Sequence, residues 1–275
     1  MSTVATRQPS SWGFGFVSRT TDQRDYRRVK FAFANALKRH FEALGHFYSL
    51  DLGLDSFACR SCIDIARRDL VGRRNEPPDA IVLMSNPGSA QPLGADYQPR
   101  ELDAETLQAE PSVREMVPIR PDGATYQVMR LMGLQRWTRT RILCLSDLRL
   151  QDCVDFDDLF HRAALMDATH PHSLFHPGRR SELEAALVTK RGGPVIAAWG
   201  AQKPLQAIAS VAVETISSRL VGLPLRDGEP WFRHASPRHK ADKLQWLEDI
   251  SVQLRRIQLR RRRRRAHRRS EGRVG

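Results

Sequence analysis

The chain has 275 residues, 41% of them hydrophobic, so it is long and apolar enough to bury a core without disulfide bonds. No N-terminal segment combines a basic stretch, an apolar stretch and a small-residue cleavage site. No apolar run reaches the roughly 18 residues that a membrane span needs. These features argue against secreted and membrane-spanning classes, and we expect a cytoplasmic, monomeric protein whose four cysteines stay reduced.

The net charge of +13 is concentrated at one end of the chain. Residues 255–275 hold eleven arginines and one glutamate, a net charge of +10, which leaves only +3 for the rest. Guanidinium groups neutralise phosphates without reading sequence, so this Arg-rich basic tail predicts binding to DNA or RNA. The alternative is a solvated tail without a specific partner. The tail lacks the Trp or Phe that a membrane-surface role needs.

Residues 1–77 are predicted to form an N-terminal helical extension. Between residues 25 and 44 the apolar side chains follow helical spacing, with basic residues on the other face. These apolar residues are Val29, Phe33, Leu37, Phe41 and Leu44. A second, short helix is predicted over residues 59–74.

Residues 78–254 predict one α/β domain, because apolar strand candidates alternate with helical patterns. The expected strands lie at 79–86, 139–148, 192–200 and 220–225. The expected helices lie at 112–117, 124–135, 155–165, 181–190, 201–220 and 239–259. A long loop is expected at 89–112, and Ser181 and Glu184 form a predicted capping box. The predicted fold class is a three-layer α/β/α arrangement with a mostly parallel central sheet of about four strands.

Residues able to carry chemistry follow three of these strands. They are Ser85-Asn86-Pro87-Gly88, Ser146-Asp147 and Trp199-Gly200, and the loop before the last helix adds His234-Ala235-Ser236-Pro237. Asn, Asp and Pro-Gly also favour ordinary turns, so each segment alone has a structural explanation. In open α/β sheets, however, ligands bind beyond the carboxyl ends of the strands, so their shared position favours a site.

Four segments, "IVLMSNPGSA", "RILCLSDL", "VIAAWGAQ" and "HASP", resemble in order and spacing the motifs of the uracil-DNA glycosylase superfamily. There, one strand ends in GQDPYH or GINPG, a middle strand ends in a base-reading Asn, and a loop carries HPSP. A closer resemblance is to a bacterial and phage domain-of-unknown-function family with an NPSTAD signature. Its "MLNPSTAD", "DPTIRR", "NLFALRATDP" and "AAWG" resemble "LMSNPGSA", "PSVRE", "SDLRLQDCVD" and "AAWG" here. The resemblance covers roughly residues 78–240.

The resemblance implies roles for individual residues in breaking the bond between a base and its sugar. Asn86 would orient the attacking water, and His234 would stabilise charge on the departing base. Tyr97 would stack on the base, and Ser146 or Asp147 would read its edge. The other implied substrate-binding residues are Ser85, Pro87, Gly88 and Ser236.

Two departures from the superfamily pattern affect base recognition. The Asn expected after the middle strand is absent, and Arg238 occupies the position of an apolar wedge that fills the gap left by a flipped base. Uracil specificity is therefore not implied. The predicted nucleic-acid contacts are Arg238, Arg260, Arg261, Arg262, Arg263, Arg264 and Arg265.

The cysteines and histidines offer alternative cofactor sites. One glycosylase branch holds an iron–sulfur cluster, for which the candidates here are Cys59, Cys62, Cys144 and Cys153. Cys144 lies within an apolar strand and the later spacing is wide, so buried structural thiols are favoured and no cofactor is expected. The histidine-rich segment lacks a regular zinc spacing, so we expect a solvated loop without metal. Its members are His161, Asp167, His170, His172 and His176.

Two functions follow. The first is a nucleic-acid-associated enzyme that hydrolyses the N-glycosidic bond of a modified or damaged base. The second is a non-catalytic nucleic-acid- or nucleotide-binding module that reuses the fold, because fold alone does not determine function. Convergence of Asn86, Tyr97 and His234 at one place would favour the enzyme.

Overall fold

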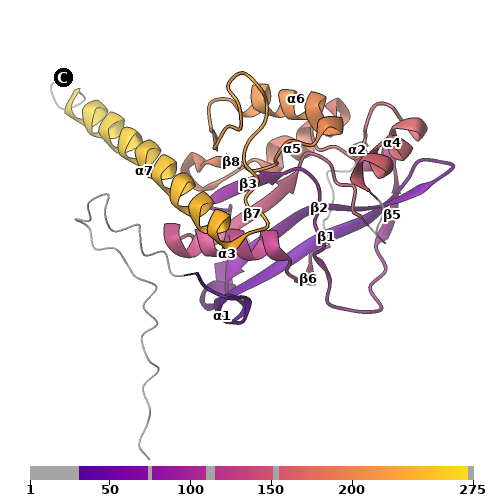
Figure 1. Cartoon of the computed structure of the whole chain (residues 1–275), viewed down its shortest axis with the longest axis horizontal. Coiled ribbons are helices and arrows are strands. Elements are labelled where there is room, and N and C mark those ends of the chain that lie inside the picture. The colour runs from indigo at the N-terminus through magenta and orange to yellow at the C-terminus, as the bar shows by residue number, and fades with distance from the viewer. Residues whose placement is uncertain (1–30, 74–75, 110–114, 151–154, 272–275) are drawn as a thin grey trace, which may run out of the picture.

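A mixed β-sheet with helices on both faces organises the computed structural model, which describes residues 31–73, 76–109, 115–150 and 155–271 (Figure 1). Within these residues the strand order is β4-β6-β1-β2-β7-β3-β8-β9, and β5 pairs with β1. The strands are β1 (Phe41–Asp51), β2 (Ser56–Arg67), β3 (Ala80–Met84), β4 (Gln91–Pro92), β5 (Arg100–Asp103), β6 (Val117–Arg120), β7 (Arg139–Cys144), β8 (Val195–Ala197) and β9 (Leu220–Gly222). The helices are α1 (Ala34–His40), α2 (Ala104–Ala109), α3 (Gly123–Gln135), α4 (Phe156–Met166), α5 (Arg180–Ala186), α6 (Gln206–Ile216) and α7 (Lys240–Glu271).

The four predicted strands correspond to β3, β7, β8 and β9, and these are parallel neighbours. The apolar run of β3 is buried throughout, as expected for a strand covered by helices on both faces. The α/β class is therefore confirmed. The mostly parallel sheet is not, because β2 pairs antiparallel with both β1 and β7, and β6 pairs antiparallel with β1 and β4.

A long hairpin of β1 and β2 replaces the helical extension that the sequence predicts. Helix α1 spans only Ala34–His40, so the helices predicted over 25–44 and 59–74 are wrong for most of the described residues. Because the hairpin belongs to the same sheet as β7, the predicted boundary after residue 77 divides a single sheet. Residues 1–30 lie outside the described part of the chain.

A bulge in this hairpin explains the misleading spacing. His46 pairs with Cys62 but Phe47 pairs with Arg60, so one extra β2 residue interrupts the ladder. Cys59 and Cys62 therefore face the same side of the sheet although three positions separate them. A three-residue repeat in a strand imitates helical spacing.

Two apolar cores lie on opposite faces of the sheet. Along β3, Ile81 and Leu83 belong to the first core, whereas Val82 and Met84 belong to the second. Helices α2, α4, α5 and α6 contribute to the first core, and α1, α3 and α7 contribute to the second. This alternation is the period-two pattern of a strand buried on both sides.

Helix α7 continues through the predicted basic tail. Trp246, Leu247, Ile250 and Leu254 are buried in the second core at helical spacing. The helix then runs past the sheet to Glu271 (Figure 1). The separate tail predicted for residues 255–275 is therefore helical as far as residue 271, and side chains from Arg260 onward lie outside the description.

Smaller elements also differ from the predictions. The predicted loop at 89–112 contains β4, β5 and α2. Helix α5 has Arg179 at its N-cap position without a side-chain capping bond, so Ser181 lies inside the helix and the capping box is wrong. The helices predicted at 124–135, 155–165 and 201–220 are confirmed as α3, α4 and α6. None of the described helices combines the length and apolar character needed to span a bilayer.

Candidate functional site

The carboxyl ends of the parallel strands meet at one edge of the sheet, and backbone hydrogen bonds continue beyond the strands there. Leu145 N donates to Met84 O at 2.8 Å, and Ser146 N donates to Ser85 O at 3.0 Å. The segments after β3 and β7 therefore stay side by side. This edge is where an open α/β sheet presents its ligand-binding residues.

Asn86 lies half-buried in the turn that follows β3. Ser85 Oγ donates to Asn86 Oδ1 at 3.0 Å, and Asn86 Nδ2 donates to Pro87 O at 3.3 Å. Gly88 packs so closely on Asp122 Oδ2 that a Cβ atom at this position would overlap with that oxygen. The turn therefore fixes the Asn86 amide and allows the start of α3 to approach.

Asp122 is the N-cap residue of α3. Its Oδ1 accepts hydrogen bonds from Thr125 N at 2.8 Å and from Thr125 Oγ1 at 2.7 Å. A capping carboxylate satisfies backbone N–H groups that have no partner within the helix. Because these bonds hold the carboxylate, it stays beside Gly88, and the first turn of α3 stays next to Asn86.

The loop at 231–237 is attached to the end of β8. Gly200 N donates to Phe232 O at 2.8 Å. Gly200 has a φ angle of +76°, a conformation that glycine adopts without strain, and a Cβ there would lie 3.8 Å from His234 Cβ. His234 thus lies beside the end of β8, one strand away from Asn86.

Ser236 connects this loop to α3. Its Oγ lies 3.5 Å from the position that a Cβ on Gly123 would take. The Asp122 carboxylate also lies near enough to His234 to influence its pKa. Three segments far apart in sequence therefore gather at one edge: the turn holding Asn86, the start of α3, and the loop carrying His234 and Ser236.

His234 is held as a neutral imidazole with a defined tautomer. Ser236 N donates to His234 Nδ1 at 3.2 Å, so Nδ1 is the acceptor and Nε2 carries the proton. Burial lowers the pKa of His234 below its ordinary value, and the negative charge of Asp122 acts in the opposite direction. At neutral pH the site therefore contains an N–H donor that carries no charge.

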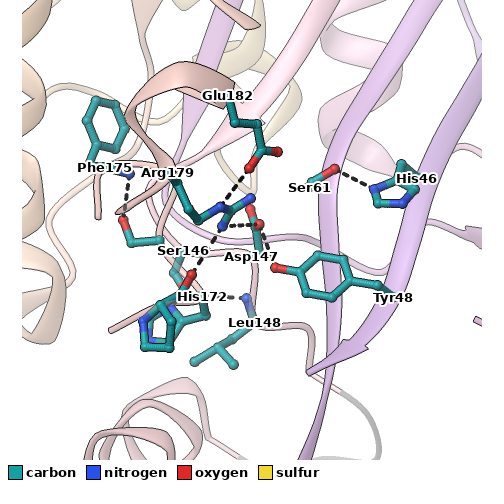
Figure 2. Close-up of polar contacts among 12 residues, drawn as sticks. His46, Tyr48, Ser61, Ser146, Asp147, Leu148, His172, Phe175, Arg179 and Glu182 are labelled. Carbon is teal, nitrogen blue, oxygen red and sulfur yellow. Dashed lines mark hydrogen bonds and ion pairs between the residues drawn. The ribbon is translucent and has the colours of Figure 1, made fainter. Parts of the chain in front are cut away.

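Asp147 belongs to a buried ionic network (Figure 2). Its Oδ2 accepts from Tyr48 Oη at 2.8 Å and from Arg179 Nη1 at 2.9 Å, and Arg179 Nε donates to Glu182 Oε2 at 2.8 Å. Burial raises the pKa of Asp147, and the Arg179 guanidinium opposes that effect. Asp147 has no exposed surface, so its placement does not support the predicted reading of a base edge.

Ser146 is equally buried and faces His172, whose Nδ1 lies 3.1 Å from Ser146 Oγ (Figure 2). Burial lowers the pKa of His172 to about 3, so its ring is neutral. The segment after α4 is a loop as predicted, but residues 171–175 are all buried, so the predicted solvation is wrong for this part. Ser146, like Asp147, is thus buried in the protein interior just after β7 and is not presented to a ligand.

Tyr97 lies against β1. Its hydroxyl donates to Phe47 O at 3.3 Å, and the two rings meet edge to face with centroids 6.2 Å apart. These contacts hold the Tyr97 ring on the second-core face of the sheet. Strand β1 is three strands away from β3, so these contacts do not support the predicted convergence of Tyr97 with Asn86 and His234.

The cysteine positions do not fit one metal cluster. Cys59 and Cys62 lie in the first core, whereas Cys144 lies in the second, on the opposite face of the sheet. A cluster bound by all three thiols would have to pass through the sheet. Cys153 lies outside the described residues. Among the described residues, no group of three or more His, Cys, Asp or Glu side chains is arranged to hold a metal ion.

Some residues at this edge were not predicted from the sequence. Asp122 has a local signal, since Pro121-Asp122-Gly123 precedes a helical pattern and Asp is a preferred N-cap residue. Arg60 has no such signal, because the sequence pattern around it predicts a helix where β2 is found. Arg149 has none either, because its position beside β2 depends on strand pairing. Of the predicted nucleic-acid contacts, Arg238 is exposed beside the start of α7, and the side chains of Arg260 to Arg265 lie outside the description.

No family model, curated protein or solved structure matches this chain.

Proposed function

We propose that the edge formed by Asn86, His234 and Ser236 binds a base within nucleic acid and hydrolyses its N-glycosidic bond. The observation that carries the proposal is the protonation state of His234. Its Nδ1 accepts from Ser236 N, and burial disfavours the imidazolium, so the Nε2–H group is a neutral donor. Such a donor suits a leaving group on which negative charge develops.

The reaction divides the work between two side chains. As the bond between C1′ and the base nitrogen breaks, its electron pair leaves with the base, and His234 Nε2–H stabilises the resulting anion. A water oriented by Asn86 then bonds to C1′ and releases its proton to solvent or to the departing base. An amide orients water without accepting its proton, so bond breaking must be well advanced when water attacks.

The parallel half of the sheet is the part that we assign to the glycosylase-like unit. Its strands β7, β3, β8 and β9 carry the motifs of the uracil-DNA glycosylase resemblance, and the hairpin of β1 and β2 is an addition to it. The support is positional, since the turn after β3 and the loop near the end of β8 both face the start of α3. Nucleic acid would be retained by the basic end of α7.

A non-catalytic binding module is the second candidate. It is favoured by the Asn86 amide, whose oxygen and nitrogen are both engaged within the turn by Ser85 Oγ and Pro87 O. An amide held in this way could present a fixed edge to a base without activating water. The two candidates share a site and differ in whether a base is released.

Mass spectrometry of reactions with a panel of modified and damaged oligonucleotides tests the proposal. Wild-type protein should release one base or a small set of bases. His234→Ala should lower the rate about 10²–10³-fold, since a preorganised donor typically contributes that much. The matched control is His239→Ala, because His239 is exposed on the same segment.

Asn86 variants separate the two candidates. Asn86→Asp should keep or raise base release, because a carboxylate can both orient water and accept its proton. Base release that is insensitive to both His234→Ala and Asn86→Asp would refute the proposed roles. Tight binding of an oligonucleotide without release of any base would favour the binding module.

A further inference from the structure

Two arginines lie on the same face of the ladder beside β2. Arg149 N donates to Ala58 O at 2.8 Å and Arg60 N donates to Asp147 O at 2.8 Å, so the segment after β7 runs antiparallel along β2. Because Arg149 is opposite Ala58, two residues before Arg60, both arginine side chains point to one side. Phe47 is opposite Arg60 on β1, and the Arg149 guanidinium carbon lies 4.9 Å from its ring centroid.

Both side chains bury donors that have no partner. Arg60 is 3% exposed, and its Nη1 donates to no neighbour. Arg149 Nε is also buried and also lacks an acceptor. Neither arginine forms an ion pair with any carboxylate in the described part of the chain. Asp147 is opposite Arg60 in the ladder, but its Oδ2 accepts from Tyr48 and Arg179, and its Oδ1 has no hydrogen-bond partner.

The charge of Arg60 acts on Arg149, and no ion pair neutralises either guanidinium in the described part of the chain. Burial and the charge of Arg60 both lower the pKa of Arg149. The thiols that these arginines influence are not counterions. Burial raises the pKa of Cys144 to about 12 although Arg60 opposes the shift, and burial also raises the pKa of Cys59, which Arg149 opposes. A buried guanidinium without a counterion is strongly unfavourable, so the arrangement is incomplete without an anion.

We propose that Arg60 and Arg149 together bind a phosphate group. The two guanidinium groups offer several N–H donors to the oxygens of one tetrahedral anion. Arginine is well suited to this role, because its planar set of donors matches the geometry of phosphate oxygens. The Phe47 ring supports the Arg149 guanidinium from one side, and the partly exposed Arg149 connects the pair to the surface.

The pair lies in line with the proposed glycosidase site. Across the edge, the order is Arg60 on β2, Cys144 at the end of β7, Asn86 after β3, and His234 beside β8. Two strand spacings, about 10 Å, separate β2 from β3. A nucleotide whose phosphate contacts the arginines would direct its sugar toward Asn86 and its base toward His234. This reading rests on the proposed function.

Equilibrium binding to the full-length protein tests the inference. The probes are inorganic phosphate, the four nucleoside 5′-monophosphates, the corresponding nucleosides, and dinucleotides with one internucleotide phosphate. Arg60→Gln and Arg149→Gln should each weaken monophosphate binding about 10- to 100-fold, since each removes charge-assisted hydrogen bonds. Nucleoside binding should change less than about twofold. Loss confined to monophosphates indicates a terminal phosphate, and equal loss for dinucleotides indicates the phosphate of a nucleic-acid strand.

The matched control is Arg162→Gln, because the Arg162 guanidinium also lies over a phenyl ring, 5.8 Å from the centroid of Phe57, but pairs with Asp55. This variant should bind every probe as the wild type does. Thermal melting provides a second readout, since inorganic phosphate should raise the wild-type Tm but not that of the Arg60 or Arg149 variants. The ligand-free variants should melt no lower than the wild type, because each removes an uncompensated buried charge.

Three results decide the matter. Unchanged monophosphate affinity in both arginine variants overturns the inference, and so does an equal loss for nucleosides, which would mean that the arginines contact the base. Phosphate binding that depends on Arg60 and Arg149 supports it even where no base is released, in which case the proposed hydrolysis alone fails. His234→Ala should leave phosphate binding intact, so the two proposals are tested separately.

Discussion

His172 makes the stability of the fold depend on pH in a way that can be calculated. Its ring is fully buried, with Nδ1 beside Ser146 Oγ, and Nε2 has no hydrogen-bond partner. The folded pKa is about 3, against 6.5 for an ordinary histidine. Because the unfolded chain binds a proton more readily, acidification favours unfolding, and stability falls as the pH drops below about 6.5.

The size of this effect follows from the two pKa values. Each pKa unit corresponds to about 1.4 kcal/mol, and between pH 7.5 and pH 5 the unfolded His172 becomes largely protonated while the folded one does not. His172 should therefore lower the free energy of unfolding by about 2 kcal/mol over this interval. Burial also lowers the pKa values of His170, His176 and His234, so these groups add to the total with the same sign.

Urea unfolding of the wild type and of His172→Asn, at pH 7.5 and pH 5, isolates the contribution of His172. Asn can keep a polar contact with Ser146 but does not titrate, so the pH-induced loss should be about 2 kcal/mol smaller in the variant. His161→Asn is the control, because His161 is exposed in the same region. An equal pH-induced loss in wild type and His172→Asn would refute the reasoning and place the His172 ring in contact with water.

Three further predictions concern the sheet edge and the basic helix. Gly88→Ala should cost about 1–3 kcal/mol, because a Cβ there overlaps with the Asp122 carboxylate that caps α3, and it should reduce base release. Gly94→Ala should do neither, because the nearest atom to a Cβ there is 3.9 Å away. Equal melting temperatures of the two variants would contradict the packing. Asp147→Asn should lower the free energy of unfolding in urea by about 3–5 kcal/mol, because it removes one carboxylate from the buried Arg179. A decrease below about 1 kcal/mol would show that water reaches the ionic network of Asp147, Arg179 and Glu182. Removing residues 260–275 should flatten the salt dependence of DNA binding by about 0.9 per lost phosphate contact, measured by fluorescence anisotropy, and an unchanged slope would exclude the basic end as the contact.

The parallel half of the sheet could be predicted because its strands are short apolar runs that end in turn residues. β3 is the clearest case, since an uninterrupted run from Ala80 to Met84 leads into Pro87-Gly88. The hairpin could not be predicted, because the bulge in β2 spaces Cys59 and Cys62 as a helix would. Apolar spacing in the preceding segment also fits a helix, yet α1 stops at His40.

The site was predictable only in part, for a related reason. Asn86, His234 and Ser236 follow strands or lie in a loop with turn chemistry, and such positions can be read directly from the sequence. Whether a residue at the end of a strand faces a ligand or a core depends on which face of the sheet its side chain lies on, and the sequence does not define this. Asp147 faces the core. Arg60 lies in the segment that was misread as helical, so its position beside the edge follows only from the strand pairing.

The most direct test of the central claim is the nitrogen-15 NMR spectrum of the His234 imidazole, assigned by comparison with His234→Ala. We expect an unprotonated Nδ1 and a protonated Nε2 at pH 7.5, and a change in the Nε2 resonance when nucleoside 5′-monophosphates are added. The neutral form should persist below the ordinary histidine pKa, because burial lowers the pKa of His234. An imidazolium at neutral pH, the opposite tautomer, or an Nε2 resonance unmoved by all four nucleotides would contradict the account.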